Sequence, residues 1–171
     1  MNVELREISK ENKEEFREVC NAVDRSYLTD RLPHPYTQED ADWWVNMVSE
    51  HDGKDGLWRA IYADGKLVGT VSVEKRNDIF RKDGELGYFL LTEYWSKGIA
   101  TEAARQICRL AFEKLDIIRI SGNYFEPNIA SGRVMEKVGF KHEGKKINAA
   151  VKGEKVYNLH LMGLLKEEFL G

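Results

Sequence analysis

The sequence of 171 residues contains few cysteines and no long apolar run. Its two cysteines, Cys20 and Cys108, form no C-x-x-C pair, so we expect buried or semi-buried free thiols and a reducing, cytoplasmic location. The charged first residues do not resemble a signal peptide. No stretch approaches the ~20 apolar residues of a membrane span. The four histidines show no paired ligand spacing, so the sequence predicts no metal site and no membrane association.

A surplus of basic charge is missing as well. The chain has 26 Lys and Arg against 29 Asp and Glu, a net charge of −3. This balance argues against a nucleic-acid-binding protein, because such a protein must neutralise phosphates. The charge divides unevenly: residues 1–84 hold 13 basic and 18 acidic side chains (net −5), and residues 85–171 hold 13 and 11 (net +2). The second half is therefore the better place for an anionic ligand.

Three prolines and scattered glycines mark no linker, and no repeat is present, so residues 1–171 are expected to form a single domain. A capping box at Thr37–Asp40 begins one predicted helix. Apolar periodicity predicts further helices over 11–23, 98–115 and 128–138, and strands over 3–8, 57–63, 66–74, 84–91, 117–124, 140–151 and 154–165. This order indicates a mixed α/β (α+β) fold with a largely antiparallel sheet. Its one strand–helix–strand unit should hold two parallel strands flanked by helices.

The segment from Tyr94 to Thr101 joins a predicted strand to the longest helix. Gly98 and Ala100 would let backbone N–H groups approach a bound group, and the helix N-terminus adds about half a positive charge. Lys97 adds a full charge. The P-loop and dinucleotide-binding motifs are both absent. The segment is therefore either an anion site for another cofactor or a turn built from small residues.

A second polar segment begins the short helix predicted over 128–138. Asn128 is suited to ligand contact and equally to a helix N-cap. Ser131 is either a reactive hydroxyl or an ordinary polar residue of the first turn.

Together these two segments resemble the GNAT acetyltransferases, in particular the RimJ/RimL-like branch that acetylates ribosomal-protein N-termini and polyamines. The resemblance covers essentially the whole chain and is carried by residues 32–37, 69–72, 84–91, 94–103, 128–131 and 136–140. It implies one N-acetyltransferase domain whose central parallel strands splay apart. It also implies acetyl-coenzyme A as co-substrate, and direct transfer of acetyl to a primary amine in a ternary complex.

The resemblance also implies a role for each residue of the cofactor site. Backbone donors of the loop hold the pyrophosphate, and Trp95 stands where Gln or Arg is common. The strand before the loop normally carries a bulge, and its backbone holds the pantetheine arm. Asn128 contacts the pantetheine or the acetyl end. The implied cofactor residues are Phe89, Leu90, Trp95, Ser96, Lys97, Gly98, Ile99, Ala100, Thr101 and Asn128.

The implied catalytic groups are Ser131 and Glu85. Met135 stands where many GNAT enzymes have a tyrosine that protonates the departing thiolate, and Ser131 is the replacement acid of this branch. Glu85, or a water chain, is the candidate base that removes a proton from the amine. Some members carry an acidic residue at the position of 148–150, where this chain has Asn-Ala-Ala.

The implied acceptor side lies in the first two helices and their loop, at Arg31, His34, Tyr36 and Trp43, with Trp58 as a further candidate. Trp44 fits the apolar stripe, so Trp43 lines the groove or is partly exposed. The expected acceptor is a protein or peptide N-terminal α-amine. The alternatives are a polyamine or other small amine, and a non-catalytic acyl-coenzyme A-binding module. A homodimer is common in such families. The acidic first half would then attract the cationic acceptor.

Overall fold

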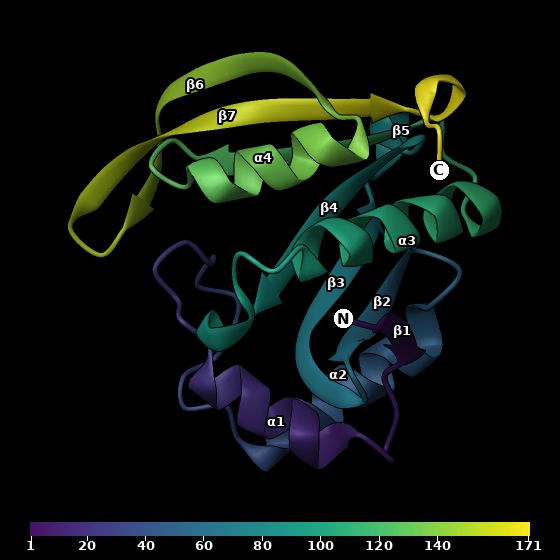
Figure 1. The fold of residues 1–171 in the computed structure, drawn as a ribbon, viewed down its shortest axis with the longest axis vertical. Coiled ribbons are helices and arrows are strands. Elements are labelled where there is room, and N and C mark those ends of the chain that lie inside the picture. Colours follow the sequence, from purple (N-terminus) through teal and green to yellow (C-terminus); the bar gives the residue numbers. More distant parts are fainter.

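A seven-stranded sheet, in the order β1-β2-β3-β4-β5-β7-β6, carries two helices on each face (Figure 1). The computed structural model describes all 171 residues. The strands are β1 (Val3–Glu7), β2 (Gly56–Ala63), β3 (Lys66–Lys75), β4 (Asp83–Leu90), β5 (Arg119–Phe125), β6 (Lys141–Lys152) and β7 (Lys155–Leu165). The helices are α1 (Lys13–Ala22), α2 (Gln38–His51), α3 (Ile99–Lys114) and α4 (Ile129–Val138). Three short 3₁₀ turns, over Asp78–Phe80, Thr92–Tyr94 and Lys166–Glu168, were not predicted.

The predicted helices and strands are confirmed, and their bounds move by one or two residues. The capping box is present, since Thr37 Oγ accepts from the Asp40 N–H and the Asp40 carboxylate accepts from the Thr37 N–H. The hairpin between β2 and β3 turns at Asp64 and Gly65, both with positive φ. Only β4 and β5 pair in parallel, as expected for the one strand–helix–strand unit.

Two apolar clusters hold the helices to the sheet. Helices α3 and α4 cover one face with residues such as Ile107 and Met135. Helices α1 and α2 cover the other face with residues such as Phe16 and Val45. Cys20 lies in the second cluster and Cys108 in the first, both free and fully buried, which confirms that prediction.

The parallel strands separate soon after they begin. β4 pairs with β5 only from Asp83 to Glu85, opposite Arg119 to Ser121. Beyond that point β4 remains in unbroken register with β3, and β5 pairs with β7 along its whole length. The bulge expected in β4 is absent from its pairing with β3. The opening arises because β4 stays paired with β3 and β5 stays paired with β7. Only the hydrogen bonds between β4 and β5 are lost.

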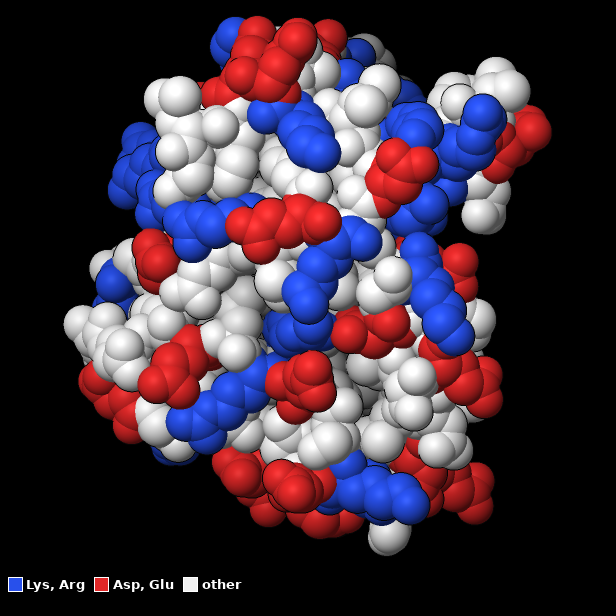
Figure 2. Space-filling view, turned by 90° about the vertical axis from the view of Figure 1, so that its right-hand side faces the viewer, with Lys and Arg blue, Asp and Glu red and all other residues white.

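The surface drawn in Figure 2 carries Lys and Arg side chains interspersed with Asp and Glu, and no stripe of one sign crosses it. No helix is both long enough and apolar enough to cross a bilayer.

Candidate functional site

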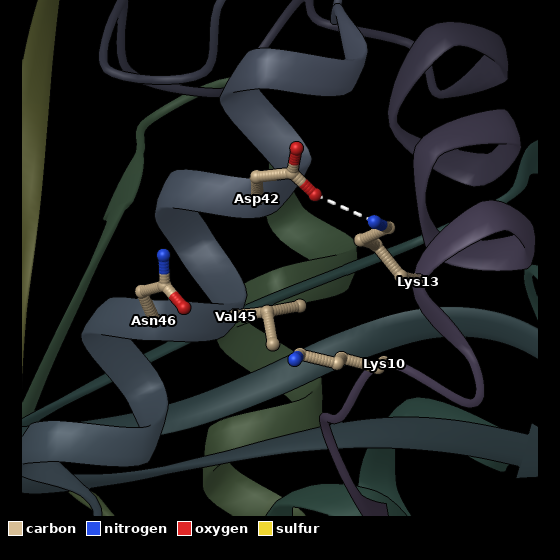
Figure 3. A pocket seen from close by; sticks show the side chains of 5 residues that line it. All are labelled: Lys10, Lys13, Asp42, Val45 and Asn46. Atoms are coloured by element: carbon tan, nitrogen blue, oxygen red, sulfur yellow. Dashed lines mark hydrogen bonds and ion pairs between the residues drawn. The ribbon is translucent and has the colours of Figure 1, made fainter.

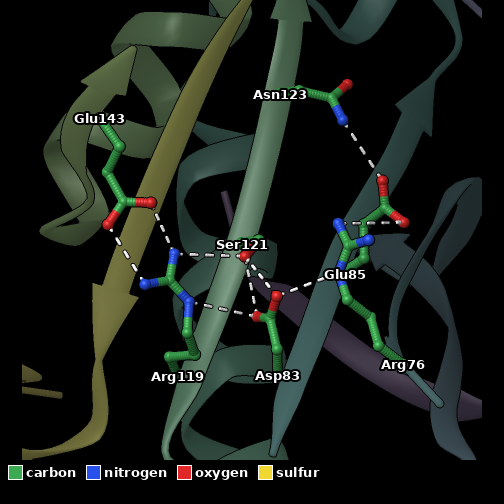
Figure 4. Close-up of polar contacts among 7 residues, drawn as sticks. All are labelled: Arg76, Asp83, Glu85, Arg119, Ser121, Asn123 and Glu143. Atoms are coloured by element: carbon green, nitrogen blue, oxygen red, sulfur yellow. Dashed lines mark hydrogen bonds and ion pairs between the residues drawn. The ribbon is translucent and has the colours of Figure 1, made fainter. Parts of the chain in front are cut away.

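A polar network closes the narrow end of the opening between β4 and β5 (Figure 4). The Asp83 carboxylate accepts from Ser121 Oγ at 2.8 Å and forms an ion pair with Arg76 Nε at 3.0 Å. It also lies 3.4 Å from Arg119 Nε. Arg119 donates to Glu143 on β6, and this hydrogen bond is the main cause that raises the pKa of Arg119. The network ties β4, β5 and β6 together where the strands still pair.

Glu85 lies at the point where the strands begin to separate. Its carboxylate accepts from Asn123 Nδ2 at 3.3 Å and lies 3.9 Å from Arg76 Nη2, with its side chain 45% exposed (Figure 4). Strand alternation turns Glu85 toward the α1/α2 face of the sheet. Gly87, next on that face, is exposed and has no side chain to fill the gap. A carboxylate therefore stands beside open space on this face.

Along the opening, the backbone edge of β4 makes no hydrogen bond to β5. The Leu91 N–H donates to Val68 and the Phe89 carbonyl points at Gly69, so these residues bond to β3. Because bonding direction alternates along a strand, Tyr88 and Leu90 direct their backbone groups into the opening. The backbone of Phe89, one of the expected cofactor residues, is thus already used in the sheet, and the backbone groups that face the opening are those of Tyr88 and Leu90.

The loop that begins α3 presents a run of unpaired donors. Every backbone N–H from Ser96 through Thr101 lacks a hydrogen-bond acceptor in the protein. Ser96 and Gly98 have φ of 59° and 78°, the left-handed conformation, and Gly98 caps the helix without a side-chain bond. Successive N–H groups at a helix N-terminus form an anion-binding cradle. This arrangement fits a phosphate-containing group such as the pyrophosphate of acetyl-coenzyme A.

Trp95 and Lys97 flank this cradle. The Trp95 indole N–H donates to the Leu90 carbonyl at 3.0 Å, so it is committed to the edge of β4. Lys97 is exposed, with Nζ 5.6 Å from the centre of the Tyr94 ring. Lys97 therefore adds an exposed positive charge beside the cradle.

The first turn of α4 borders the opening from the other face. Asn128 stands at the N-cap, but its side chain makes no capping hydrogen bond and remains available to a ligand. Ser131 Oγ lies 2.6 Å from Tyr88 Oη. Met135, one turn later, is buried in the core. Tyr88 was not among the expected site residues, although alternation along β4 already places its side chain on the face of the sheet opposite to that of Glu85, toward α4.

The candidate acid and base thus approach the opening from opposite faces of the sheet. Glu85 belongs to the α1/α2 face, whereas Tyr88 and Ser131 belong to the α3/α4 face. A thioester placed in the opening would have a carboxylate on one side and hydroxyl groups on the other. This arrangement suits attack by an amine from the face of the carboxylate and departure of the thiolate toward the hydroxyl groups.

Two of the expected acceptor residues do not reach this site. Tyr36 is 5% exposed and packs edge-on against Phe16 in the core, so it cannot line a groove. Trp43 is 65% exposed on the side of α2 that faces away from the sheet. Arg31 and His34 are exposed in the loop between α1 and α2.

Arg31 and Trp58 meet on a second carboxylate of the α1/α2 face. Arg31 Nη1 lies 3.5 Å from Glu74, and the Trp58 indole donates to Glu74 at 3.0 Å. Glu74 lies directly opposite Glu85 in the β3–β4 register. Glu74 is therefore committed to two partners, and Glu85 is the less committed carboxylate.

The loop between α1 and α2 also contacts the β6–β7 hairpin. Rings of Tyr27, Phe125 and Tyr157 pack with centroids 5.2–6.2 Å apart. Lys152 Nζ lies 2.8 Å from Asp30. The contacts of Tyr27 with Tyr157 and of Asp30 with Lys152 join residues more than 100 positions apart, which no local pattern could indicate.

A shallow pocket lies between α1 and α2 (Figure 3). Lys13 crosses it to pair with Asp42, and its other lining residues are Lys10, Val45 and Asn46. None of the candidate site residues lines it.

Comparison with known proteins agrees with the resemblance to GNAT acetyltransferases. Residues 2–141 match the acetyltransferase (GNAT) domain family. YdaF of Bacillus subtilis, which carries the name of a ribosomal N-acetyltransferase, is 32% identical over 117 residues, covering 68% of this chain and 63% of YdaF. The chain thus spans less than two thirds of that relative's length.

Two solved structures share the fold at low identity. Ribosomal-protein-S5-alanine acetyltransferase from Vibrio fischeri superposes with a TM-score of 0.86 at 20% identity, covering 100% of this chain and 97% of that one. Spermidine N-acetyltransferase from Vibrio cholerae, in complex with CoA and spermine, gives 0.81 at 19% identity, covering 99% and 98%. The family match over most of the sequence, on this fold, shows that the chain belongs to the GNAT acetyltransferases, which use acetyl-coenzyme A as co-substrate.

Proposed function

We propose that this chain transfers acetyl from acetyl-coenzyme A to a protein or peptide N-terminal α-amine, by direct attack in a ternary complex. The observation that carries the proposal is the free edge of β4 beside the loop of unpaired N–H groups from Ser96 to Thr101. A pantetheine arm can add to that edge as an extra strand, with its pyrophosphate at the α3 N-terminus.

The chemistry requires a neutral amine and a stabilised leaving group. The amine nitrogen forms a bond to the thioester carbonyl carbon, and the C–S bond breaks with its electron pair going to sulfur. Glu85 accepts the proton that the amine loses and passes it to solvent. Ser131 donates its hydroxyl hydrogen to the sulfur and regains one from water. A backbone N–H on the free edge of β4 polarises the thioester carbonyl.

The charges on the acceptor side favour a single amine over a polyamine. Glu74 already pairs with Arg31 and accepts from Trp58, whereas Glu85 has one long hydrogen bond from Asn123 and a longer contact to Arg76, so Glu85 is the carboxylate more open to a cation. A polyamine carries several charges and needs several free carboxylates. An α-amine also has a pKa of about 7.7–8.0, against about 10.4 for a lysine-like amine, so more of it is neutral at pH 7.

A thiol-release assay tests this function. Purified protein would be incubated with acetyl-coenzyme A and one of three acceptor sets: peptides of varied N-terminal residue, the same peptides with blocked N-termini, or polyamines. We expect release with free peptides and none with blocked ones. Thiol release with polyamines and not with free peptides would show that the acceptor is a polyamine and not an N-terminal α-amine. Binding of acetyl-coenzyme A without release by any amine would identify a non-catalytic module instead.

A further inference from the structure

The hydrogen bond between Tyr88 and Ser131 crosses the opening from β4 to the first turn of α4. Their hydroxyl oxygens lie 2.6 Å apart, shorter than the usual 2.7–2.8 Å of an O–H···O bond. Tyr88 is one of the two β4 residues whose backbone groups face the opening, and Ser131 is the proposed proton donor. A side chain outside the proposed catalytic pair thus contacts one of its members directly.

The chemistry of the two hydroxyls sets the direction of this bond. The distance fits either hydroxyl as donor, but a phenol is a stronger acid and a better donor than an aliphatic alcohol, and the Tyr88 hydroxyl also donates to the Ser131 carbonyl at 3.4 Å. We therefore assign Tyr88 as the donor and Ser131 Oγ as the acceptor. Burial raises the pKa of Tyr88 more than the bond to Ser131 lowers it, which keeps the phenol protonated and able to donate.

The hydrogen of Ser131 is then left without an acceptor in the protein. Its hydroxyl makes no bond other than the one to Tyr88, and it does not bond back to the carbonyl one turn earlier, the usual partner of a helical serine. Because one hydrogen bond polarises the next, a serine that accepts from a phenol is a better donor to a third group.

We propose that Tyr88 is a positioning residue for acetyl transfer: by donating to Ser131 Oγ, it aims the Ser131 hydrogen at the sulfur of the departing coenzyme A. Tyr88 keeps its own proton throughout, so the proton balance of the reaction is unchanged. This inference rests on the proposed function, because it needs a leaving thiolate at Ser131.

The experiment compares the turnover of Tyr88→Phe, Ser131→Ala and the double variant. Tyr124→Phe is the matched control, since the Tyr124 ring stacks on His160 and packs against Gly132 of the same helix, while its hydroxyl makes no hydrogen bond. Each variant would be assayed for kcat, for the KM of acetyl-coenzyme A and for thermal unfolding, so that effects on chemistry, binding and folding are separated.

We expect kcat to fall about 100-fold in Ser131→Ala, within the range of general acid catalysis. In Tyr88→Phe it should fall about 10-fold, the equivalent of one hydrogen bond. The double variant should match Ser131→Ala, because Tyr88 acts only through Ser131. The KM of acetyl-coenzyme A should stay within about twofold, and Tyr124→Phe should behave as the parent protein.

Three outcomes would overturn the inference while leaving the proposed function intact. These are an unchanged kcat in Tyr88→Phe, an effect confined to KM or thermal stability, and losses that multiply to about 1,000-fold in the double variant. If the parent protein releases no thiol with any amine, the proposed function fails and the inference fails with it.

Discussion

Replacing Glu85 by Gln tests whether this carboxylate is the base of the reaction. Glutamine keeps the size of the side chain and still accepts from Asn123, so the contact at 3.3 Å survives. What is lost is the charge, and with it a long ion pair to Arg76 at 3.9 Å between side chains that are nearly half exposed. Such a pair contributes less than about 0.5 kcal/mol, so folding stability should hardly change.

The loss of activity should be much larger than the loss of stability. General base catalysis is worth about 100- to 10,000-fold. The Glu85 side chain is 45% exposed and accepts one long hydrogen bond, so water can partly replace it. We therefore expect the lower end, a fall of about 100-fold in kcat, or about 2.7 kcal/mol of transition-state stabilisation.

The pH dependence separates a base from a residue that only binds the amine. In the parent protein Glu85 can deprotonate the bound ammonium form, so kcat/KM should vary little below the amine pKa. In Glu85→Gln only neutral amine reacts, so kcat/KM should rise about tenfold per pH unit up to about pH 8, the pKa of an α-amine.

Glu143→Gln is the control for this experiment, because Glu143 pairs with Arg119 in the same network but lies on β6, away from the opening. It should lower the thermal unfolding temperature and leave kcat unchanged. A parent-like kcat and pH profile in Glu85→Gln would refute the assignment and leave a water chain as the base.

Three other predictions concern the loop that begins α3, the two cysteines, and Glu126 with its hydrogen-bond partners. In Gly98→Ala the added Cβ meets open space, but the backbone must keep a left-handed φ, which is unfavourable for alanine. The substitution should therefore lower the free energy of unfolding by about 1 kcal/mol and the unfolding temperature by about 2–4 °C, and it should raise the KM of acetyl-coenzyme A. An unchanged melting curve would contradict this. Burial raises the pKa of Cys20 to about 12 and that of Cys108 further, so neither thiol should react with a disulfide reagent at pH 8 until the protein unfolds, and prompt labelling would disprove their burial. Hydrogen bonds, chiefly from His160, lower the pKa of the Glu126 carboxyl. The contribution of Glu126 to stability is therefore present above its unfolded-state pKa and is lost as the pH falls through its folded-state pKa. Glu126→Gln should lower the unfolding temperature at pH 7 but not near pH 3, and an equal loss at both pH values would count against the argument.

The order and type of the main helices and strands follow from local patterns. The apolar period of α3, the capping box of α2 and the two-residue turn at Asp64 and Gly65 each depend on residues within a few positions of one another. The donor loop before α3 is equally local, because its left-handed Gly98 and its uncapped N–H groups belong to one short stretch. These features could therefore be predicted from the sequence before the fold was known.

Features that depend on residues far apart in the chain were not readable. The separation of β4 from β5 depends on which outer neighbour each strand follows, and the pairing of Tyr88 with Ser131 joins residues 43 positions apart. The same holds for Tyr36, whose position in the α1–α2 loop suggested a groove residue but whose ring lies in the core. Sequence alone determined the main elements and indicated a candidate anion-binding loop, because both depend on residues close together in the chain. Only the tertiary structure decided which face each polar side chain meets, because that depends on strand register and helix packing.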